Sequence, residues 1–189
     1  CTVPPEIDGE INDRIWEATP WSSAFIDIEG SSKPKPYFDT HFKMLWDKKY
    51  LYIAARLYDR HIWATLTQRE SVIFEDNDFE VFIDPDGDAH NYMELEVNAY
   101  GTIWDLFLNK PYRDGGRADN KWNFEGLRMA DKVYGKINRT TGKDSCWTIE
   151  MAIPWESMTE FSASKKVPVD GEQWRMNFSR VQWKTKIKD

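Results

Sequence analysis

Two alternating runs joined by a tight turn constrain the fold of this chain more than any other feature. Apolar and polar side chains alternate with a period of two through residues 78–84 and again through residues 92–98. This period is typical of a strand with one buried face, and the intervening Pro85-Asp86-Gly87 favours a hairpin turn. We therefore predict an antiparallel hairpin whose core face carries Phe79, Val81 and Ile83 opposite Val97, Leu95 and Met93.

The other face of this hairpin is crowded with carboxylates. The predicted register places Glu80 directly opposite Glu96, and like charges in that position destabilise a sheet. The pair therefore requires exposure to solvent, a counter-charge, a shared proton or a ligand. Arg175 and Arg180 are candidate counter-charges, although the alternation of their strand predicts that Arg180 faces the core. This acidic face is where we expect function.

Short strands dominate the rest of the chain. Gly, Pro, Asn and Asp turns separate apolar or alternating runs at 21–28, 38–46, 50–58, 79–84, 92–99, 102–108, 127–137, 147–153 and 174–183. This spacing favours an antiparallel sandwich or barrel over alternating β and α units. The one convincing helical turn is 154–158, which has a proline near its first position. We predict an all-β fold with one short helix.

Composition limits the classes of protein and partner. With 189 residues, of which 41% are hydrophobic and 15% aromatic, the chain can fill the core of one domain, predicted over residues 1–189. A net charge of -7 argues against a nucleic-acid partner or an anionic membrane surface, because both need a basic face. No apolar run reaches the roughly 18 residues of a membrane-spanning helix. Cys1 and Cys146 allow one disulfide or none, and Cys1 also suits a lipid-modified N-terminus.

Aromatic residues exceed what such a core needs. Ten Trp, ten Phe and eight Tyr imply that some rings are partly exposed, and such rings suit the C–H-rich face of a sugar. Strand parity predicts that Trp46, Trp147 and Trp174 belong to the core. The rings in or beside loops, which are candidates for ligand contact, are Phe74, Trp104, Tyr112 and Trp122.

The carboxylates permit three kinds of chemistry. Glu80 and Glu96 would lie at the separation that a retaining glycosidase needs. This spacing is not specific, because any two Glu side chains opposite each other on one face of an antiparallel hairpin have it. Hydrogen bonding to a ligand, cation binding and simple solvation are the alternatives. In the turn, Asp84, Asp86 and Asp88 offer oxygen ligands suited to calcium, without the later Glu of a complete EF-hand loop.

Five segments in order resemble the family-9 carbohydrate-binding modules, and in particular the family-9-like proteins of Bacteroidetes. They are Ile7-Asp-Gly-Glu-Ile-Asn-Asp-Arg-Ile-Trp16, Met44-Leu-Trp-Asp-Lys-Lys-Tyr-Leu-Tyr-Ile-Ala-Ala55, Asp78-Phe-Glu-Val-Phe-Ile-Asp84, Trp147-Thr-Ile-Glu-Met-Ala-Ile-Pro-Trp155 and Trp174-Arg-Met-Asn-Phe-Ser-Arg180. The resemblance implies a jelly-roll-like antiparallel β-sandwich, structural calcium in many members and no required cofactor. It also implies that sugar chain ends bind between two aromatic rings.

The resemblance also implies roles for particular residues. The first ring corresponds to Phe74, the hydrogen-bonding acid to Glu80, and the amide and hydroxyl partners to Asn177 and Ser179. Glu96 is a departure, because the better-known modules carry a basic residue there. The second ring belongs to a Trp-rich segment that would follow residue 189, so we expect the C-terminal strand or strands of the family to be missing.

These observations predict a non-catalytic module that binds an oligo- or polysaccharide, fused or adjacent to glycoside hydrolases. We expect it to be secreted, periplasmic or associated with the outer membrane. Phe74, Trp104 and Tyr112 would stack on the sugar, while Glu80, Glu96, Asn177 and Ser179 would bond its hydroxyls. Two alternatives stay open: a glycosidase using Glu80 and Glu96, and a haem b electron-transfer sandwich with axial ligands drawn from Met44, Met93, His41 and His90.

Overall fold

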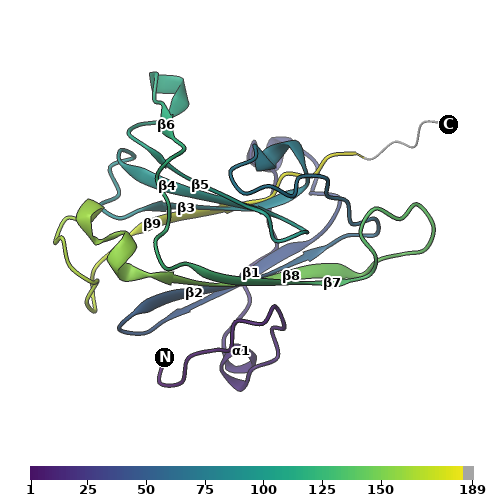
Figure 1. Ribbon diagram of the computed structural model, residues 1–189, viewed down its shortest axis with the longest axis horizontal. Helices are drawn as coiled ribbons and strands as arrows, with labels where there is room; N and C mark the ends of the chain where they lie inside the picture. The colour runs from purple at the N-terminus through teal and green to yellow at the C-terminus, as the bar shows by residue number, and fades with distance from the viewer. Residues whose placement is uncertain (185–189) are drawn as a thin grey trace.

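Two antiparallel sheets packed face to face form the body of the protein. The computed structural model describes residues 1–184. One sheet has four strands in the order β1 (Thr40–Trp46), β2 (Tyr50–Tyr58), β8 (Cys146–Pro154) and β7 (Arg128–Tyr134). The other has five, in the order β6 (Ala118–Asp119), β5 (Ile103–Leu108), β4 (Tyr92–Asn98), β3 (Asp78–Asp84) and β9 (Arg175–Ser179). Figure 1 shows the two layers edge on, and the predicted all-β sandwich is confirmed.

The predicted hairpin forms in the predicted register. Strands β3 and β4 pair with Phe79 opposite Val97, Val81 opposite Leu95 and Ile83 opposite Met93. All six of these side chains are 0% exposed, and they pack in the core between the sheets. Local alternation therefore predicted which face of the five-stranded sheet points inward, and the acidic face is its outer face.

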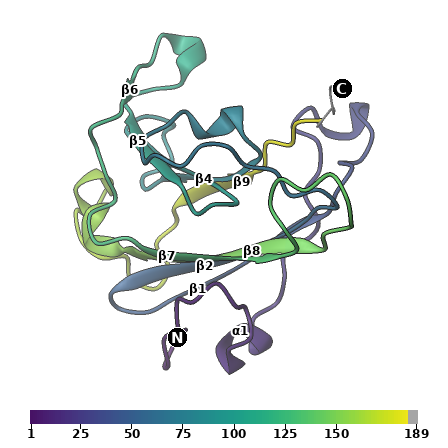
Figure 2. The same cartoon turned by 45° about the vertical axis from the view of Figure 1, so that its right-hand side comes forward.

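Helical structure is sparse and lies partly where the sequence did not predict it. The helix α1 (Arg14–Ala18) packs under the four-stranded sheet (Figures 1 and 2). The helical turn expected at residues 154–158 forms as the 3-10 turn η4 (Trp155–Ser157) after β8, and not as an α-helix. Tertiary contact explains α1, since the buried Trp16 packs against Tyr52 and Ala152. The remaining 3-10 turns are η1 (Gly30–Ser32), η2 (Ile73–Glu75), η3 (Tyr112–Asp114) and η5 (Thr159–Phe161).

The three tryptophans that strand parity assigned to the core differ in how far they are buried. Trp147 is buried at 1% exposure, and the partly buried Trp174 packs edge to face on Trp155. The prediction for Trp46 is wrong, because its ring is 60% exposed. Trp46 ends an edge strand beside the turn at 47–49, where parity no longer implies coverage by the opposite sheet.

Two further features bear on the expectations above. Cys1 is exposed and Cys146 is buried, and both are free thiols. Among residues 1–184, the helices are all too short or too polar to cross a bilayer.

Candidate functional site

The outer face of the five-stranded sheet gathers four carboxylates. We call Asp78, Glu80, Glu94 and Glu96 the acidic cluster; they lie on the adjacent strands β3 and β4. Their exposed fractions are 0%, 9%, 7% and 2% respectively. The outer face is therefore not a solvated acidic surface. Loops fold over it and remove these groups from water.

The segment before β3 forms much of this cover. Asp76 anchors it by accepting hydrogen bonds from the backbone N–H groups of Thr65 and Leu66, at 2.7 and 2.8 Å. Ile73 of η2 is 0% exposed and packs on Trp104 and Leu106 of β5. These contacts hold η2 against the sheet. They leave the next side chain, Phe74, 43% exposed at the rim of the acidic cluster.

The structure brings the sequence-predicted ring residues to this face. The Phe74 backbone N–H donates to Glu96 Oε2 at 2.9 Å, and the Phe74 ring lies 6.0 Å from that of Trp104, which pairs with Glu96 across the β4–β5 ladder. Tyr112 on η3 is 58% exposed. Burial and the nearby charges of Glu94 and Glu96 raise the pKa of its phenol. Trp122 lies elsewhere, against Phe107, Phe124 and Phe161.

Strand β9 supplies the predicted polar partners. Ser179 pairs with Glu80 across the β3–β9 ladder and its hydroxyl donates to Glu80 Oε2. Asn177 pairs with Phe82 and therefore points out of the same face. Five of the seven proposed carbohydrate contacts thus lie on the outer face of the sheet: Glu80, Glu96, Trp104, Asn177 and Ser179. Phe74 is hydrogen-bonded to Glu96 there, and Tyr112 lies on the separate turn η3.

Trp183 is a residue of this face that the sequence reasoning missed. Its indole Nε1–H donates to the carbonyl oxygen of Phe74 at 2.8 Å, and its backbone N–H donates to Asn77 Oδ1 at 2.7 Å. The ring is 56% exposed, so a second exposed ring stands next to Phe74 within the chain itself. The available signal was parity, because residue 183 follows Asn177 and Ser179 at a period of two.

The candidate counter-charges bind elsewhere. Arg180 faces inward, as its strand parity predicted, and its guanidinium lies 3.3 Å from Asp59. Arg175 lies on the outer face but contacts Asp84 at 4.0 Å. The hypothesis that either arginine neutralises Glu80 or Glu96 is therefore wrong. Within the described residues, no Lys or Arg forms an ion pair with the acidic cluster.

Burial without an ion pair changes the pKa values of these carboxyl groups, although the charge of Arg180 partly opposes the change at Asp78. Loss of hydration is the largest cause, and repulsion by neighbouring carboxylates adds to it. Together they raise the pKa of Asp78 to about 9 and that of Glu96 to about 10. The pKa of Glu94 rises to about 7, and that of Glu80 is also raised by burial.

Two buried polar atoms of this face lack a hydrogen-bond partner among residues 1–184. They are Asp78 Oδ2 and Trp104 Nε1. The other oxygen of Asp78 accepts from the backbone N–H of Val181 at 3.0 Å. Unpartnered buried polar atoms are rare in folded proteins, so these two indicate a place for a polar occupant.

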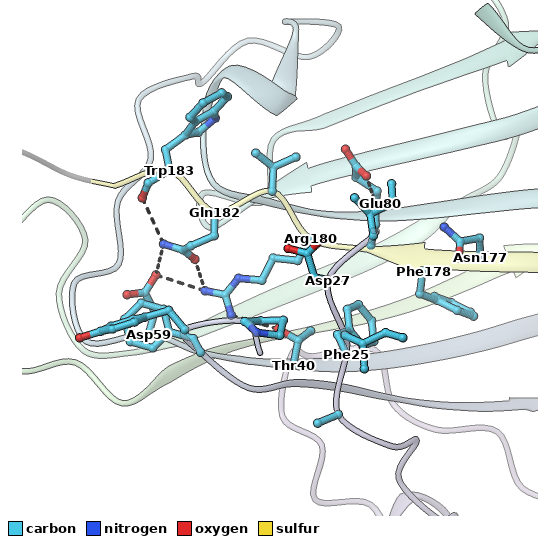
Figure 3. Close-up of a pocket in the computed structure, with 18 of the residues that line it drawn as sticks. Phe25, Asp27, Thr40, Asp59, Glu80, Asn177, Phe178, Arg180, Gln182 and Trp183 are labelled. Atoms are coloured by element: carbon cyan, nitrogen blue, oxygen red, sulfur yellow. Dashed lines mark hydrogen bonds and ion pairs between the residues drawn. The ribbon is translucent and has the colours of Figure 1, made fainter. Parts of the chain in front are cut away.

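A groove of about 1260 Å³ beside β9 reaches Glu80, the one member of the acidic cluster that lines it. Figure 3 shows Trp183, Glu80 and Asn177 among its lining residues, while the guanidinium of Arg180 points toward Asp59 and Gln182. Phe25 lines it from the N-terminal segment. A ligand can therefore approach Glu80 and Asn177 from the open edge of the sheet.

The aspartate turn is arranged differently. Carboxylate oxygens of Asp84, Asp86 and Asp88 lie within 4.8 Å of one another, a spacing that suits a cation. Both oxygens of Asp84 already accept backbone hydrogen bonds, from Gly87 and Ala89 at 2.9 Å each. Calcium at this turn stays a prediction from the sequence.

The proposed haem ligands do not form an evident site. Met93 is fully buried in the hydrophobic core between the sheets, and Met44 packs against that core. Nδ1 of His41 lies 3.0 Å from the Ser22 carbonyl oxygen, and Nδ1 of His90 lies 3.1 Å from that of Asp88. No observation favours haem over the outer-face site.

Comparison with known proteins gives one family and several relatives. The model of the family described as carbohydrate family 9 binding domain-like matches residues 7–173. Exoglucanase XynX of Acetivibrio thermocellus is 28% identical over 158 residues, which cover 82% of this chain and 12% of that protein. Endo-1,4-beta-xylanase A of Thermoanaerobacterium saccharolyticum is 29% identical over 155 residues, covering 82% of this chain and 11% of the enzyme. The match thus spans only about an eighth of either relative.

Solved structures share the fold. A putative carbohydrate-binding protein from Bacteroides uniformis superposes with a TM-score of 0.70 at 16% identity, covering 95% of this chain and 79% of that one. A family 9 carbohydrate-binding module from Caldicellulosiruptor kristjanssonii, solved with cellotriose, gives a TM-score of 0.59 at 18% identity, covering 93% and 71%.

Proposed function

This chain belongs to the carbohydrate family 9 binding domain-like family, and from that premise we propose that the acidic, ring-flanked outer face is its glycan-binding site. The observation that carries the proposal is the neighbouring pair of exposed rings, Phe74 and Trp183, next to the unpaired carboxylates. Sugars offer an apolar C–H face and a rim of hydroxyls. Exposed rings match the first, and carboxylate and amide groups match the second.

Each residue has a part in this arrangement. Phe74, Trp183 and Tyr112 are exposed enough to contact a sugar ring, whereas Trp104 at 7% exposure supports Phe74 from beneath. Glu80, Glu96, Asn177 and Ser179 provide hydrogen-bonding groups from β3, β4 and β9.

The family description favours binding over hydrolysis. A retaining glycosidase needs one ionised carboxylate as nucleophile and one protonated carboxyl as acid. Burial raises the pKa of both Glu80 and Glu96, the latter to about 10, and the family is described by binding rather than by a reaction. We therefore assign no catalytic residue.

The curated relatives suggest the setting. They are named as an exoglucanase and an endoxylanase, and the matched region is a small part of each. We propose that this module works with polysaccharide-degrading enzymes outside the cytoplasm, in the secreted, periplasmic or outer-membrane-associated space. Because a related module was solved with cellotriose, cello- and xylo-oligosaccharides are the first ligands to test.

Calorimetric titration with a panel of such oligosaccharides tests the site. Phe74→Ala and Trp183→Ala should each weaken binding about tenfold or more, since each removes a stacking surface. Trp46→Ala is the matched control, because Trp46 is also an exposed ring, at 60%, but lies on the opposite sheet. Unchanged affinity in both site variants would move the site elsewhere.

A further inference from the structure

Three members of the acidic cluster form a compact oxygen cage. One carboxylate oxygen each from Asp78, Glu80 and Glu96 lie within 4.8 Å of one another. Calcium binds oxygen ligands at about 2.3 to 2.6 Å, so two ligands of one ion are at most about 5 Å apart. The three oxygens therefore fit around a single calcium ion with little movement.

A second observation is independent of this spacing. Asp78 is 0% exposed, and its Oδ2 atom has no hydrogen-bond partner in the part of the chain that the structure describes. A buried carboxylate oxygen without a donor is costly. A cation in the cage would satisfy that atom.

The charges of these three acids also favour a divalent cation as the occupant. Neither Arg175 nor Arg180 pairs with these acids, because they contact Asp84 and Asp59 instead. When ionised, these three buried carboxylates repel one another, and a divalent ion offsets more of that repulsion than the single charge of an ammonium group. Hard carboxylate oxygens, without nitrogen or sulfur ligands, favour calcium over transition metals.

We propose that Asp78, Glu80 and Glu96 bind a calcium ion at the floor of the outer-face site. Three side chains leave part of the six to eight coordination positions of calcium open. Those positions take hydroxyl oxygens of the glycan, so that calcium bridges protein and sugar. This second step rests on the proposed function, whereas ion binding does not.

Terbium luminescence on the metal-stripped full chain, excited through tryptophan, measures the ion alone. We expect a signal that calcium displaces, and at least a tenfold loss of affinity in Glu96→Gln and Asp78→Asn. Glu125→Gln is the matched control, because Glu125 is exposed and belongs to neither acidic triplet. It should leave the signal unchanged.

A calcium-dependent rise in the melting temperature, absent in Glu96→Gln, checks that the variant is folded and lacks only the ion. Loss of the terbium signal in Asp86→Asn, which alters the other acidic triplet, but not in Glu96→Gln would overturn the assignment. The assignment would also be overturned if no terbium luminescence appeared at terbium concentrations up to the millimolar range.

Oligosaccharide titration with calcium and with chelator then tests the bridge. Binding that requires calcium supports it, and binding equal under both conditions overturns it. Calcium-independent preference for amino sugars over neutral sugars would identify an ammonium group as the occupant instead. If calcium binds but no oligosaccharide does, the glycan function fails while the ion site stands.

Discussion

The indole of Trp183 donates a hydrogen bond to the main-chain carbonyl of Phe74, across 109 positions of sequence. This bond joins the segment after β9 to the η2 turn before β3. It places the exposed Trp183 against the main chain of the exposed Phe74, next to carboxylates that form no ion pair with a basic side chain within residues 1–184.

That bond separates two contributions of Trp183. Trp183→Phe keeps an aromatic surface but removes the donor to Phe74, so we expect a loss of glycan affinity of about two- to fivefold, equivalent to a hydrogen bond of about 0.5 to 1 kcal/mol. Trp183→Ala should cost about tenfold or more. Calorimetry on both variants checks the order, and equal losses would show that the ring surface contributes nothing beyond the bond.

The buried pair of Arg180 and Asp59 should matter for stability. The two side chains are 6% and 2% exposed, and Arg180 also donates to the Tyr58 carbonyl and to Thr40. Arg180→Met leaves Asp59 buried without its partner and should lower the free energy of unfolding by about 3 to 5 kcal/mol. Urea unfolding of Arg180→Met combined with Asp59→Leu should show a smaller loss than Arg180→Met alone.

Glu150 should make stability depend on pH. It is 0% exposed, and burial raises its pKa to about 7, although Trp16 Nε1 and the Gly9 N–H donate to it. Because the folded pKa exceeds the unfolded one, the stabilisation is complete below about pH 4.5 and is lost as pH rises through 7.

The measurement compares unfolding free energies of the wild type and Glu150→Gln from pH 4.5 to 8. Relative to the variant, the wild type should lose about 3 kcal/mol at most over this range. The other buried acids titrate in both proteins and cancel in the difference. A constant difference across the range would contradict the prediction.

Gly9 should not tolerate a side chain. Its φ is +87°, and a Cβ would lie 2.6 Å from the main-chain carbonyl carbon of Asp131. We expect Gly9→Ala to destabilise the protein by about 2 to 4 kcal/mol, through both strain and overlap. Gly30→Ala is the control, because Gly30 has a φ of +70° with no atom within 4 Å, and it should cost only about 1 kcal/mol. Equal thermal shifts would show that the overlap is relieved at no cost.

Sequence reasoning succeeded where the relevant physics is local. The period of two in β3, β4 and β9 predicted the pairing of Glu80 with Glu96 and the inward direction of Arg180. It failed for Trp46, because parity predicts a direction but not whether the opposite layer covers it. It also failed to predict α1, whose five residues depend on the docking of Trp16.

By itself, the sequence determined the sandwich class, the register of the central hairpin and the likeness to a carbohydrate-binding family. The first two follow from alternation and turn chemistry among neighbouring residues, and the third from five segments that resemble the family in order along the chain. Only the tertiary structure decided that the acids are covered, that Arg180 binds Asp59, and that Trp183 lies against Phe74. Those relationships depend on how distant loops and layers pack, and packing determines both which charges lose water and which partners remain within reach.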